Sequence, residues 1–140
     1  MGRVLAIDWG KKRVGAAISD PTCTIAASLP TLEARPVKEL CSRLRDIIDR
    51  EGVSLVLVGY PKNMDGSVSS SAAAARRFGE KLVKPYRGKV ALVLQDERLT
   101  SWSAKKMLGE LGERSSKESG RIDQVVAASL LQDYLDSRRS

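Results

Sequence analysis

The sequence contains no histidine. This absence excludes nucleophilic sites that depend on histidine, histidine general bases and histidine-containing zinc sites. The two cysteines, Cys23 and Cys41, are 18 positions apart and form no Cys-x-x-Cys pair, so a zinc ribbon or a dithiol redox centre is excluded too. A metal ion that requires no nitrogen ligand, such as magnesium, remains compatible with this composition.

Aromatic residues are also scarce, at 4% of the chain, which argues against a surface that stacks on nucleic-acid bases. No apolar run approaches the ~20 residues that a membrane helix needs, and no signal peptide precedes the first strand, so we expect a cytoplasmic protein. Basic residues outnumber acidic ones by 24 to 17, for a net charge of +7. This excess favours an anionic partner, of which nucleic acid is the commonest, although a charge of this size also occurs on ordinary soluble domains.

The pattern of apolar residues predicts a single α/β domain over residues 1–140. Three strands come first, and two further strands then alternate with helices, which predicts a mixed five-stranded sheet with three antiparallel strands followed by two parallel ones and helices on its faces. Pro30 marks an edge position or a bulge in the third strand. The predicted strands are 4–7 (closed by Asp8), 13–20, 24–32, 54–59 and 89–94, and the predicted helices are 37–51, 67–84, 100–111 and a last one from Ile122 onward.

Acidic residues follow the predicted strands at positions that meet at one edge of such a sheet. Asp8 ends the first strand, and Asp96 and Glu97 follow the fifth, where ligands gather in parallel sheets. Asp8 on its own is more typical of a turn, but the convergence favours a metal site. Magnesium prefers a few carboxylates with water and substrate phosphate, and two-metal phosphodiester chemistry needs several such ligands.

Asp96 and Glu97 would face opposite sides of a continuing strand, so we expect only one of them at the metal. Glu97 is preferred because its longer side chain can reach a neighbouring strand. The alternatives are a pair of loop acids or an ion pair between Glu97 and Arg98. Asp123, near the start of the last helix, is by itself more typical of a helix cap, but beside the other acids it becomes a plausible ligand.

Three motifs in order resemble the YqgF (RuvX) family: residues 8–15, 58–67 and 96–101. Asp123 with Ala127-Ala128 and the ending 131–135 match it as well, so the resemblance spans nearly the whole chain. It implies an RNase H-like fold, relation to the RuvC nucleases, and a divalent metal, Mg²⁺ or Mn²⁺. The family is named both as a Holliday junction resolvase and as the nuclease that matures the 5′ end of 16S ribosomal RNA. Carried over by position, the resemblance implies that Asp8, Glu97 and Asp123 are the catalytic metal ligands.

One position departs from that pattern. Nucleases of this fold usually carry an acid at the end of the fourth strand, where this chain has Gly59 between Val58 and Tyr60. Asp65 in the following loop could stand nearby, although the loop could equally contact phosphate. Structured RNA or branched DNA is the expected partner, a homodimer is left open, and the expected nucleic-acid contacts are Lys11, Lys12, Arg13, Lys62, Asn63 and Arg98.

Two other interpretations compete with a nuclease. A non-catalytic RNase H-like module that binds nucleic acid or a transcription or ribosome partner is compatible with the missing acid. An actin-like ATPase begins with a similar hairpin but needs two such lobes, and this chain has only one. Arg76-Arg77 and Lys105-Lys106 are more typical of solvated helix faces than of contacts.

Overall fold

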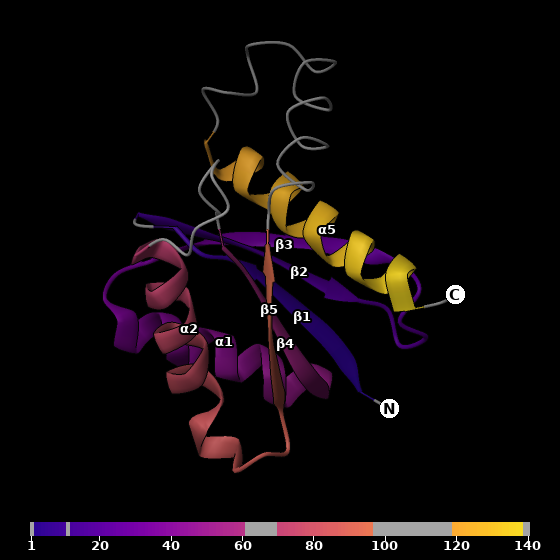
Figure 1. Cartoon of the computed structure of the whole chain (residues 1–140), viewed down its shortest axis with the longest axis horizontal. Coiled ribbons are helices and arrows are strands. Elements are labelled where there is room, and N and C mark those ends of the chain that lie inside the picture. Colours follow the sequence, from indigo (N-terminus) through magenta and orange to yellow (C-terminus); the bar gives the residue numbers. More distant parts are fainter. Residues whose placement is uncertain (1, 11, 61–69, 97–118, 139–140) are drawn as a thin grey trace.

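The computed structural model describes residues 2–10, 12–60, 70–96 and 119–138. The strands form one five-stranded sheet in the order β3-β2-β1-β4-β5, with helices on both faces (Figure 1). None of the helices in the described ranges is long and apolar enough to cross a bilayer. The elements are β1 (Arg3–Asp8), β2 (Arg13–Ser19), β3 (Ala26–Glu33), α1 (Val37–Glu51), β4 (Val53–Tyr60), α2 (Ser70–Val83), the 3₁₀ turn η1 (Lys84–Tyr86), β5 (Ala91–Asp96) and α5 (Ser119–Arg138).

Pairing in the sheet changes from antiparallel to parallel at β1. The pairs β1–β2 and β2–β3 are antiparallel, whereas β1–β4 and β4–β5 are parallel. This is the mixed sheet predicted from the sequence. Strand β3 lies at an edge, where Pro30 removes no hydrogen bond from a central ladder, and its register with β2 shifts between Val14 and Ala16. The predicted helix over 100–111 lies outside the described residues.

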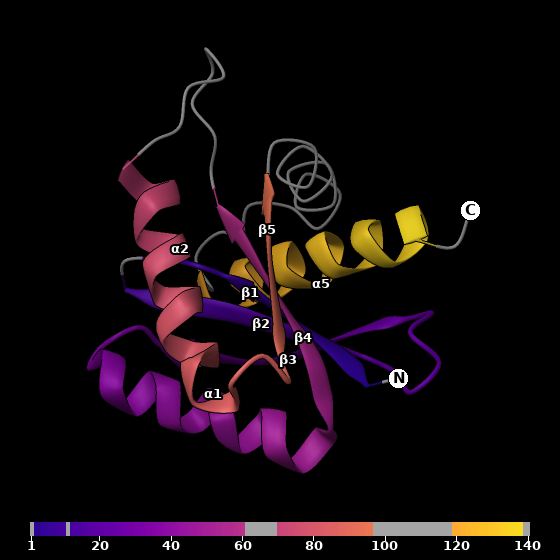
Figure 2. The ribbon, with the colours of Figure 1, turned by 60° about the horizontal axis from the view of Figure 1, so that its bottom comes forward.

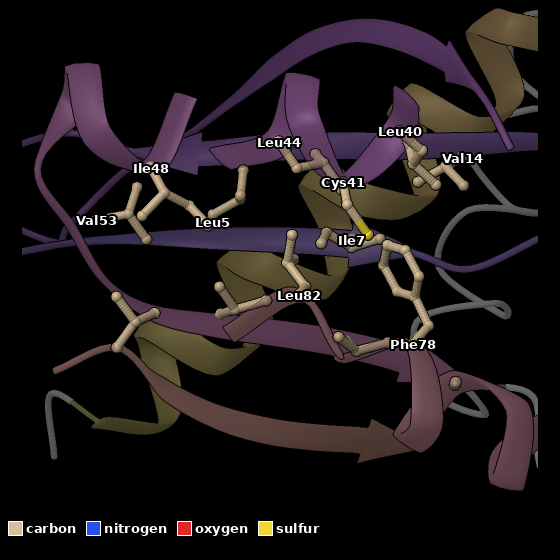
Figure 3. Close-up of a cluster of buried hydrophobic side chains, with 14 of the residues drawn as sticks. Leu5, Ile7, Val14, Leu40, Cys41, Leu44, Ile48, Val53, Phe78 and Leu82 are labelled. Atoms are coloured by element: carbon tan, nitrogen blue, oxygen red, sulfur yellow. The ribbon is translucent and has the colours of Figure 1, made fainter. Parts of the chain in front are cut away.

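Side chains of β1 alternate between two hydrophobic cores. Leu5 and Ile7 are fully buried with side chains from α1 and α2 (Figure 3). Val4 and Ala6 pack on the other face with Leu130 and other residues of α5. Figure 2 shows the layers, with α1 and α2 on one side of the sheet and α5 on the other. The central strands are apolar on both faces because both faces are covered.

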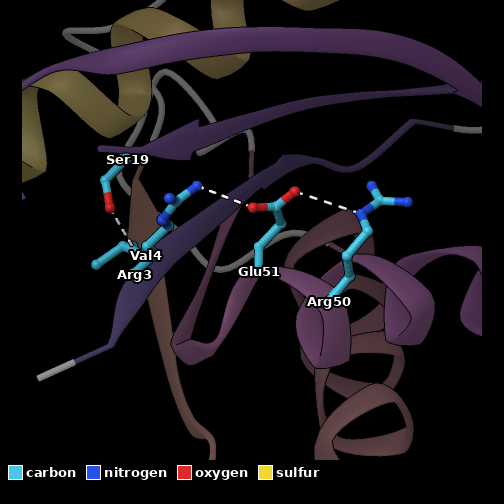
Figure 4. Close-up of polar contacts among 5 residues, drawn as sticks. All are labelled: Arg3, Val4, Ser19, Arg50 and Glu51. Atoms are coloured by element: carbon cyan, nitrogen blue, oxygen red, sulfur yellow. Dashed lines mark hydrogen bonds and ion pairs between the residues drawn. The ribbon is translucent and has the colours of Figure 1, made fainter. Parts of the chain in front are cut away.

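Polar contacts fix the start of β1. The backbone N–H of Val4 donates to the buried Ser19 Oγ at 2.9 Å (Figure 4). Arg3 Nη1 lies 2.9 Å from Glu51 Oε2 at the end of α1, and Arg50 contacts the same carboxylate at 3.3 Å. The buried hydrogen bond contributes about 1 kcal/mol, and half-exposed ion pairs usually contribute less. These contacts join β1, β2 and α1 at the end of the strand away from Asp8.

Helices α1 and α2 end close to the glycine and the proline that predict their ends in the sequence. Gly52 takes the left-handed conformation (φ 65°) that closes α1. Helix α2 gives way to a 3₁₀ turn that contains Pro85, because proline cannot continue the hydrogen-bond ladder. Arg45 of α1 donates to the carbonyls of Lys81 at 2.8 Å and Leu82 at 3.2 Å, so a cation satisfies the carboxyl end of α2.

Helix α5 runs against the direction of β1. Near its end, Gln132 accepts a hydrogen bond from the N–H of Ala26 at 2.9 Å and donates to the carbonyl of Thr24 at 3.0 Å. Leu135 packs against Val4 at the beginning of β1. The first turns of α5 consequently lie at the other end of β1, where the parallel strands finish, and Figures 1 and 2 agree on this placement.

Candidate active site

Asp8 is the last residue of β1 and belongs to a row of residues that crosses four strands. It lies opposite Gly15 on β2 and Gly59 on β4, and Gly59 lies opposite Gln95 on β5. Because Ala6 faces α5 and side chains alternate along a strand, Asp8 lies on the α5 face as well. Its side chain is half-buried. The structure thus places Asp8 at the carboxyl end of a central strand, as predicted.

Both cross-strand neighbours of Asp8 are glycines, and both are buried. Side chains paired across strands normally have Cβ atoms about 4.5–5.5 Å apart, so any other residue would fill the space beside the carboxylate. Neither Gly15 nor Gly59 has a positive φ, so the backbone conformation does not require glycine at either position. A magnesium ion holds its ligands at about 2.0–2.1 Å and keeps several waters. Neither cross-strand neighbour therefore places a side chain beside the Asp8 carboxylate.

Trp9, the next residue, anchors the end of β1 on the opposite face. Its ring stacks on Phe78 of α2, with the ring centroids 4.3 Å apart and the planes 26° apart. Phe78 is only 4% exposed, and Trp9 packs against the α1 and α2 core. Asp8 is therefore attached to a strand end that is held by an aromatic pair, although the pair itself lies across the sheet.

Strand β5 continues through Asp96, two residues beyond the predicted end at Leu94. Position 96 pairs with Tyr60, and position 95 pairs with Gly59. Position 96 is therefore on the same face of β5 as Leu94, which packs toward α1 and α2. Position 95 is on the opposite face, in the same row as Asp8. The choice of Glu97 over Asp96 assumed that the strand continues beyond Leu94. The structure shows that it continues as far as Asp96. Glu97 itself lies outside the described residues.

The position of Asp123 differs from the one expected. Helix α5 begins at Ser119, so Asp123 is its fifth residue instead of a member of its first turn. Free backbone N–H groups are confined to the first four residues of a helix, which removes the basis for interpreting Asp123 as a cap. The sequence places this start later, at Ile122, because Gly120 ends a polar stretch that begins at Gly112. Position 123 lies one turn before Ala127, which is buried against β1 and β4.

No group of three Cys, Asp or Glu side chains suited to a metal occurs in the part of the chain that the structure describes. Of the three predicted ligands, only Asp8 has a described side chain. The complete ligand set therefore stays a prediction, supported by the meeting of the ends of β1, β4 and β5 with the start of α5.

Among the predicted phosphate contacts, Lys12 and Arg13 are exposed at the beginning of β2, close to Asp8 in the β1–β2 hairpin. The carbonyl of Lys12 accepts a hydrogen bond from the N–H of Ala34 at 2.9 Å, and Arg13 pairs with Glu33 on β3. The hairpin is thus held against the segment before α1 while its basic side chains remain accessible. The other predicted contacts, Lys11, Lys62, Asn63 and Arg98, lie outside the described residues, as does Asp65.

Two features of the site were not predicted from the sequence: the pair of glycines, Gly15 and Gly59, beside Asp8, and the contact between Trp9 and Phe78. For Gly59 we considered only that the position carries no acidic residue, and we assigned no role to Gly15 or Phe78. A glycine inside an apolar strand is itself a signal, because it weakens the strand and often marks close approach by a ligand or another backbone. The sequence alone does not show that Gly15 and Gly59 flank the same residue, because this depends on the register of β1 with β2 and β4. Gln95, across Gly59 from Asp8, was missed for the same reason.

Solved structures share this fold at low sequence identity. Thermus thermophilus RuvC, in complex with a Holliday junction substrate, superposes with a TM-score of 0.58 at 16% identity, covering 99% of this chain and 96% of RuvC. The fowlpox virus resolvase, solved with Holliday junction DNA, gives 0.58 at 13% identity, with 99% of each chain covered. The chain thus has the RNase H-like fold of the RuvC-type resolvases.

Closer relatives define the family. A family model described as "RuvX: Holliday junction resolvase" matches residues 2–137. A protein of Chloroflexus aurantiacus named "Putative pre-16S rRNA nuclease" is 42% identical over 137 residues, covering 98% of this chain and 88% of the relative. A protein of Acetivibrio thermocellus with the same name is 38% identical over 137 residues, covering 97% of this chain and 96% of the relative. The chain belongs to the RuvX family.

Proposed function

We propose that this chain is a metal-dependent nuclease that hydrolyses phosphodiester bonds in structured nucleic acid. The observation that carries the proposal is the surroundings of Asp8. A half-buried carboxylate ends a central strand, its cross-strand neighbours Gly15 and Gly59 have no side chains, and the ends of β4 and β5 and the start of α5 meet beside it. A half-buried carboxylate flanked by two glycines, in a histidine-free chain, suits an oxygen-preferring divalent cation.

Asp8, Glu97 and Asp123 are the proposed ligands, and Mg²⁺ or Mn²⁺ is the proposed ion. When bound, such ions activate a water and neutralise charge on the attacked phosphate and the leaving oxygen. Lys12 and Arg13, exposed in the hairpin beside Asp8, would hold flanking phosphates and so fix the scissile bond over the strand ends. The sheet supplies rigidity, because β1 is paired on both sides up to Asp8.

The precursor of 16S ribosomal RNA is the substrate that we propose first. The relatives at about 40% identity carry that substrate in their names, whereas the structures bound to junction DNA share at most 16% identity and support only the fold. Branched DNA remains the second candidate, because the family description names Holliday junctions. A site that contacts mainly phosphates would accept either nucleic acid, since it makes few demands on the bases.

Gly59 favours one alternative to a nuclease. An RNase H-like fold without the usual acid at the fourth strand could bind nucleic acid, or a transcription or ribosome partner, without cutting it. The two functions differ in what a metal does, because a binding module needs none for its activity.

The test is cleavage by the purified chain of an end-labelled RNA carrying the 5′ leader of 16S ribosomal RNA, next to a four-way DNA junction of similar size. We expect product from the RNA with Mg²⁺ or Mn²⁺, none in EDTA, and recovery when the metal is restored. Cleavage of the junction alone would make branched DNA the substrate. Tight binding of either substrate without metal-dependent product would favour the non-catalytic module.

A further inference from the structure

Positive charge is concentrated in one short stretch of the chain. Between positions 76 and 89 there are six basic residues and one acidic residue, a net charge of +5 in a chain of +7. All six basic side chains are exposed. We call them the α2 basic strip: Arg76, Arg77, Lys81, Lys84, Arg87 and Lys89.

The strip occupies the outer side of α2 and the turn that follows. The inner side of α2 is formed by Ala75, Phe78 and Leu82, all buried against the sheet. Since 3.6 residues make one helical turn, the exposed positions 77, 81 and 84 line up on the opposite side. Burial of the inner side therefore orients Arg77 and Lys81 outward.

No acidic residue in the described part of the chain forms an ion pair with the strip. Among the described residues, the recorded ion pairs are Arg3–Glu51 and Arg50–Glu51, neither of which involves it. Glu80 is the one acid within its range. Asp49 of α1 lies at its far end and accepts a hydrogen bond from the Tyr86 hydroxyl at 2.9 Å. Burial and this hydrogen bond raise the pKa of Tyr86 to about 12, so the tyrosine adds no negative charge at neutral pH.

One end of the strip reaches the edge of the sheet at which the candidate site lies, although on the face opposite to Asp8. A groove of about 320 Å³ is lined by Arg76 together with Tyr60 and Leu94, from the ends of β4 and β5. From there α2 runs along the outside of the sheet toward the beginning of β5 (Figure 2). The rise of 1.5 Å per residue puts positions 76 and 84 about 12 Å apart, and phosphates of one duplex strand are about 3.4 Å apart along the axis. The strip could therefore span several successive phosphates.

We propose that the α2 basic strip is a second nucleic-acid contact, which binds the phosphate backbone of the substrate beyond the segment held near Asp8. The identity of the substrate rests on the proposed function. Taken as sequence alone, Arg76 and Arg77 were typical of a solvated helix face. In the structure four further exposed cations follow on α2 and the segment after it, no member of the strip is in an ion pair within the described residues, and Arg76 lies beside the ends of β4 and β5. Binding there releases counterions, so it contributes affinity without reading sequence.

The experiment compares two double variants with the same change in net charge. The strip variant carries Arg77→Gln and Lys81→Gln. The control carries Arg43→Gln and Arg50→Gln on the exposed side of α1, outside the strip. Binding of the leader RNA is measured between 50 and about 200 mM salt, a range in which phosphate contacts dominate the change in affinity. Cleavage is measured on the same RNA and on a short RNA that spans only the cut site.

If both side chains contact phosphate, the strip variant should lower the log–log salt slope by about 1.4 for single strands to 1.8 for duplex, and the control should leave it unchanged. The strip variant should raise KM for the long RNA while kcat and cleavage of the short RNA stay at the wild-type value. A slope equal to that of the control would overturn the proposal, even if cleavage is normal. A slope that falls as expected without any metal-dependent cleavage by wild type would instead refute the nuclease function and leave the second contact standing.

Discussion

Replacing Gly59 by alanine should separate catalysis from stability. Positions 8 and 59 are directly paired, and adjacent strands lie about 4.8 Å apart, so the new methyl group would occupy space beside the Asp8 carboxylate. A magnesium ion held by Asp8 would keep several water ligands, and the methyl group would compete with them for this space. Loss of one such ligand should raise the metal concentration for half-maximal cleavage at least about tenfold, equivalent to about 1.4 kcal/mol.

Stability of Gly59→Ala should remain at the wild-type value or rise. The φ of Gly59 is not positive, so alanine can adopt its backbone conformation, and such replacements typically stabilise by about 0.4–1 kcal/mol through the unfolded state. The assays are cleavage over a magnesium series and urea unfolding monitored by circular dichroism.

Val58→Ile is the matched control, because it adds a methyl group to the other face of the same strand. Val58 is completely buried in the α1 and α2 core, where overpacking costs about 1–3 kcal/mol. We expect this variant to lose stability and to keep its metal dependence, the reverse of Gly59→Ala. If the metal dependence of Gly59→Ala is unchanged, the absence of a side chain at position 59 is not needed for a metal ion to bind at Asp8.

Three further predictions concern the contact between Trp9 and Phe78, the turn between β2 and β3, and the other acidic residues. Phe78→Ala should lower the free energy of unfolding by about 3–5 kcal/mol, because it removes the buried partner of Trp9; a loss below about 1 kcal/mol in urea titrations would contradict that role. Asp20 accepts hydrogen bonds from the N–H of Ile25, the hydroxyl of Thr22 and the N–H of Thr24, which hold its pKa well below the usual range. Its stabilisation is therefore present above the unfolded pKa of about 3.9 and is lost as pH falls through the folded value. Asp20→Ala should lower the urea midpoint at pH 7, and its difference from wild type should shrink below about pH 4; a difference independent of pH would count against the carboxylate. Glu97→Gln and Asp123→Asn should each abolish cleavage and the double variant should lose little more, since ligands of one site act as a unit. Asp96→Asn should be milder than Glu97→Gln, and the opposite ranking would move the ligand to Asp96.

Much of the fold follows from local sequence signals. The apolar runs that end at Asp8 and Gly59 are strands because β-branched and aliphatic residues fill both covered faces of the sheet. Gly52 and Pro85 end the helices for reasons of backbone geometry that need no tertiary information. The change from antiparallel to parallel pairing follows from the order of strands and helices, because a helix between strands brings the chain back to the same edge.

The parts that the sequence did not predict depend on tertiary context. The alignment of Gly15, Asp8, Gly59 and Gln95 is a matter of register, and a shift by one residue would move each strand's side chains to the other face. The early start of α5 at Ser119 reflects a helix that passes through Gly120 despite its low propensity. The unneutralised α2 basic strip could not be inferred from its residues, because their partners are set by packing.

The most direct test of the proposed site is Asp8→Asn. We expect cleavage of the leader RNA to fall more than about 100-fold at every magnesium concentration, since even residues that only support a metal ligand typically change activity 10–100-fold. The melting temperature without metal should stay within about 3 °C of wild type, the shift that about 1 kcal/mol produces in a chain of this size. A variant that still cleaves, or one that loses cleavage only because it unfolds, would show that Asp8 is a structural residue at the end of β1 and contradict the proposed metal site.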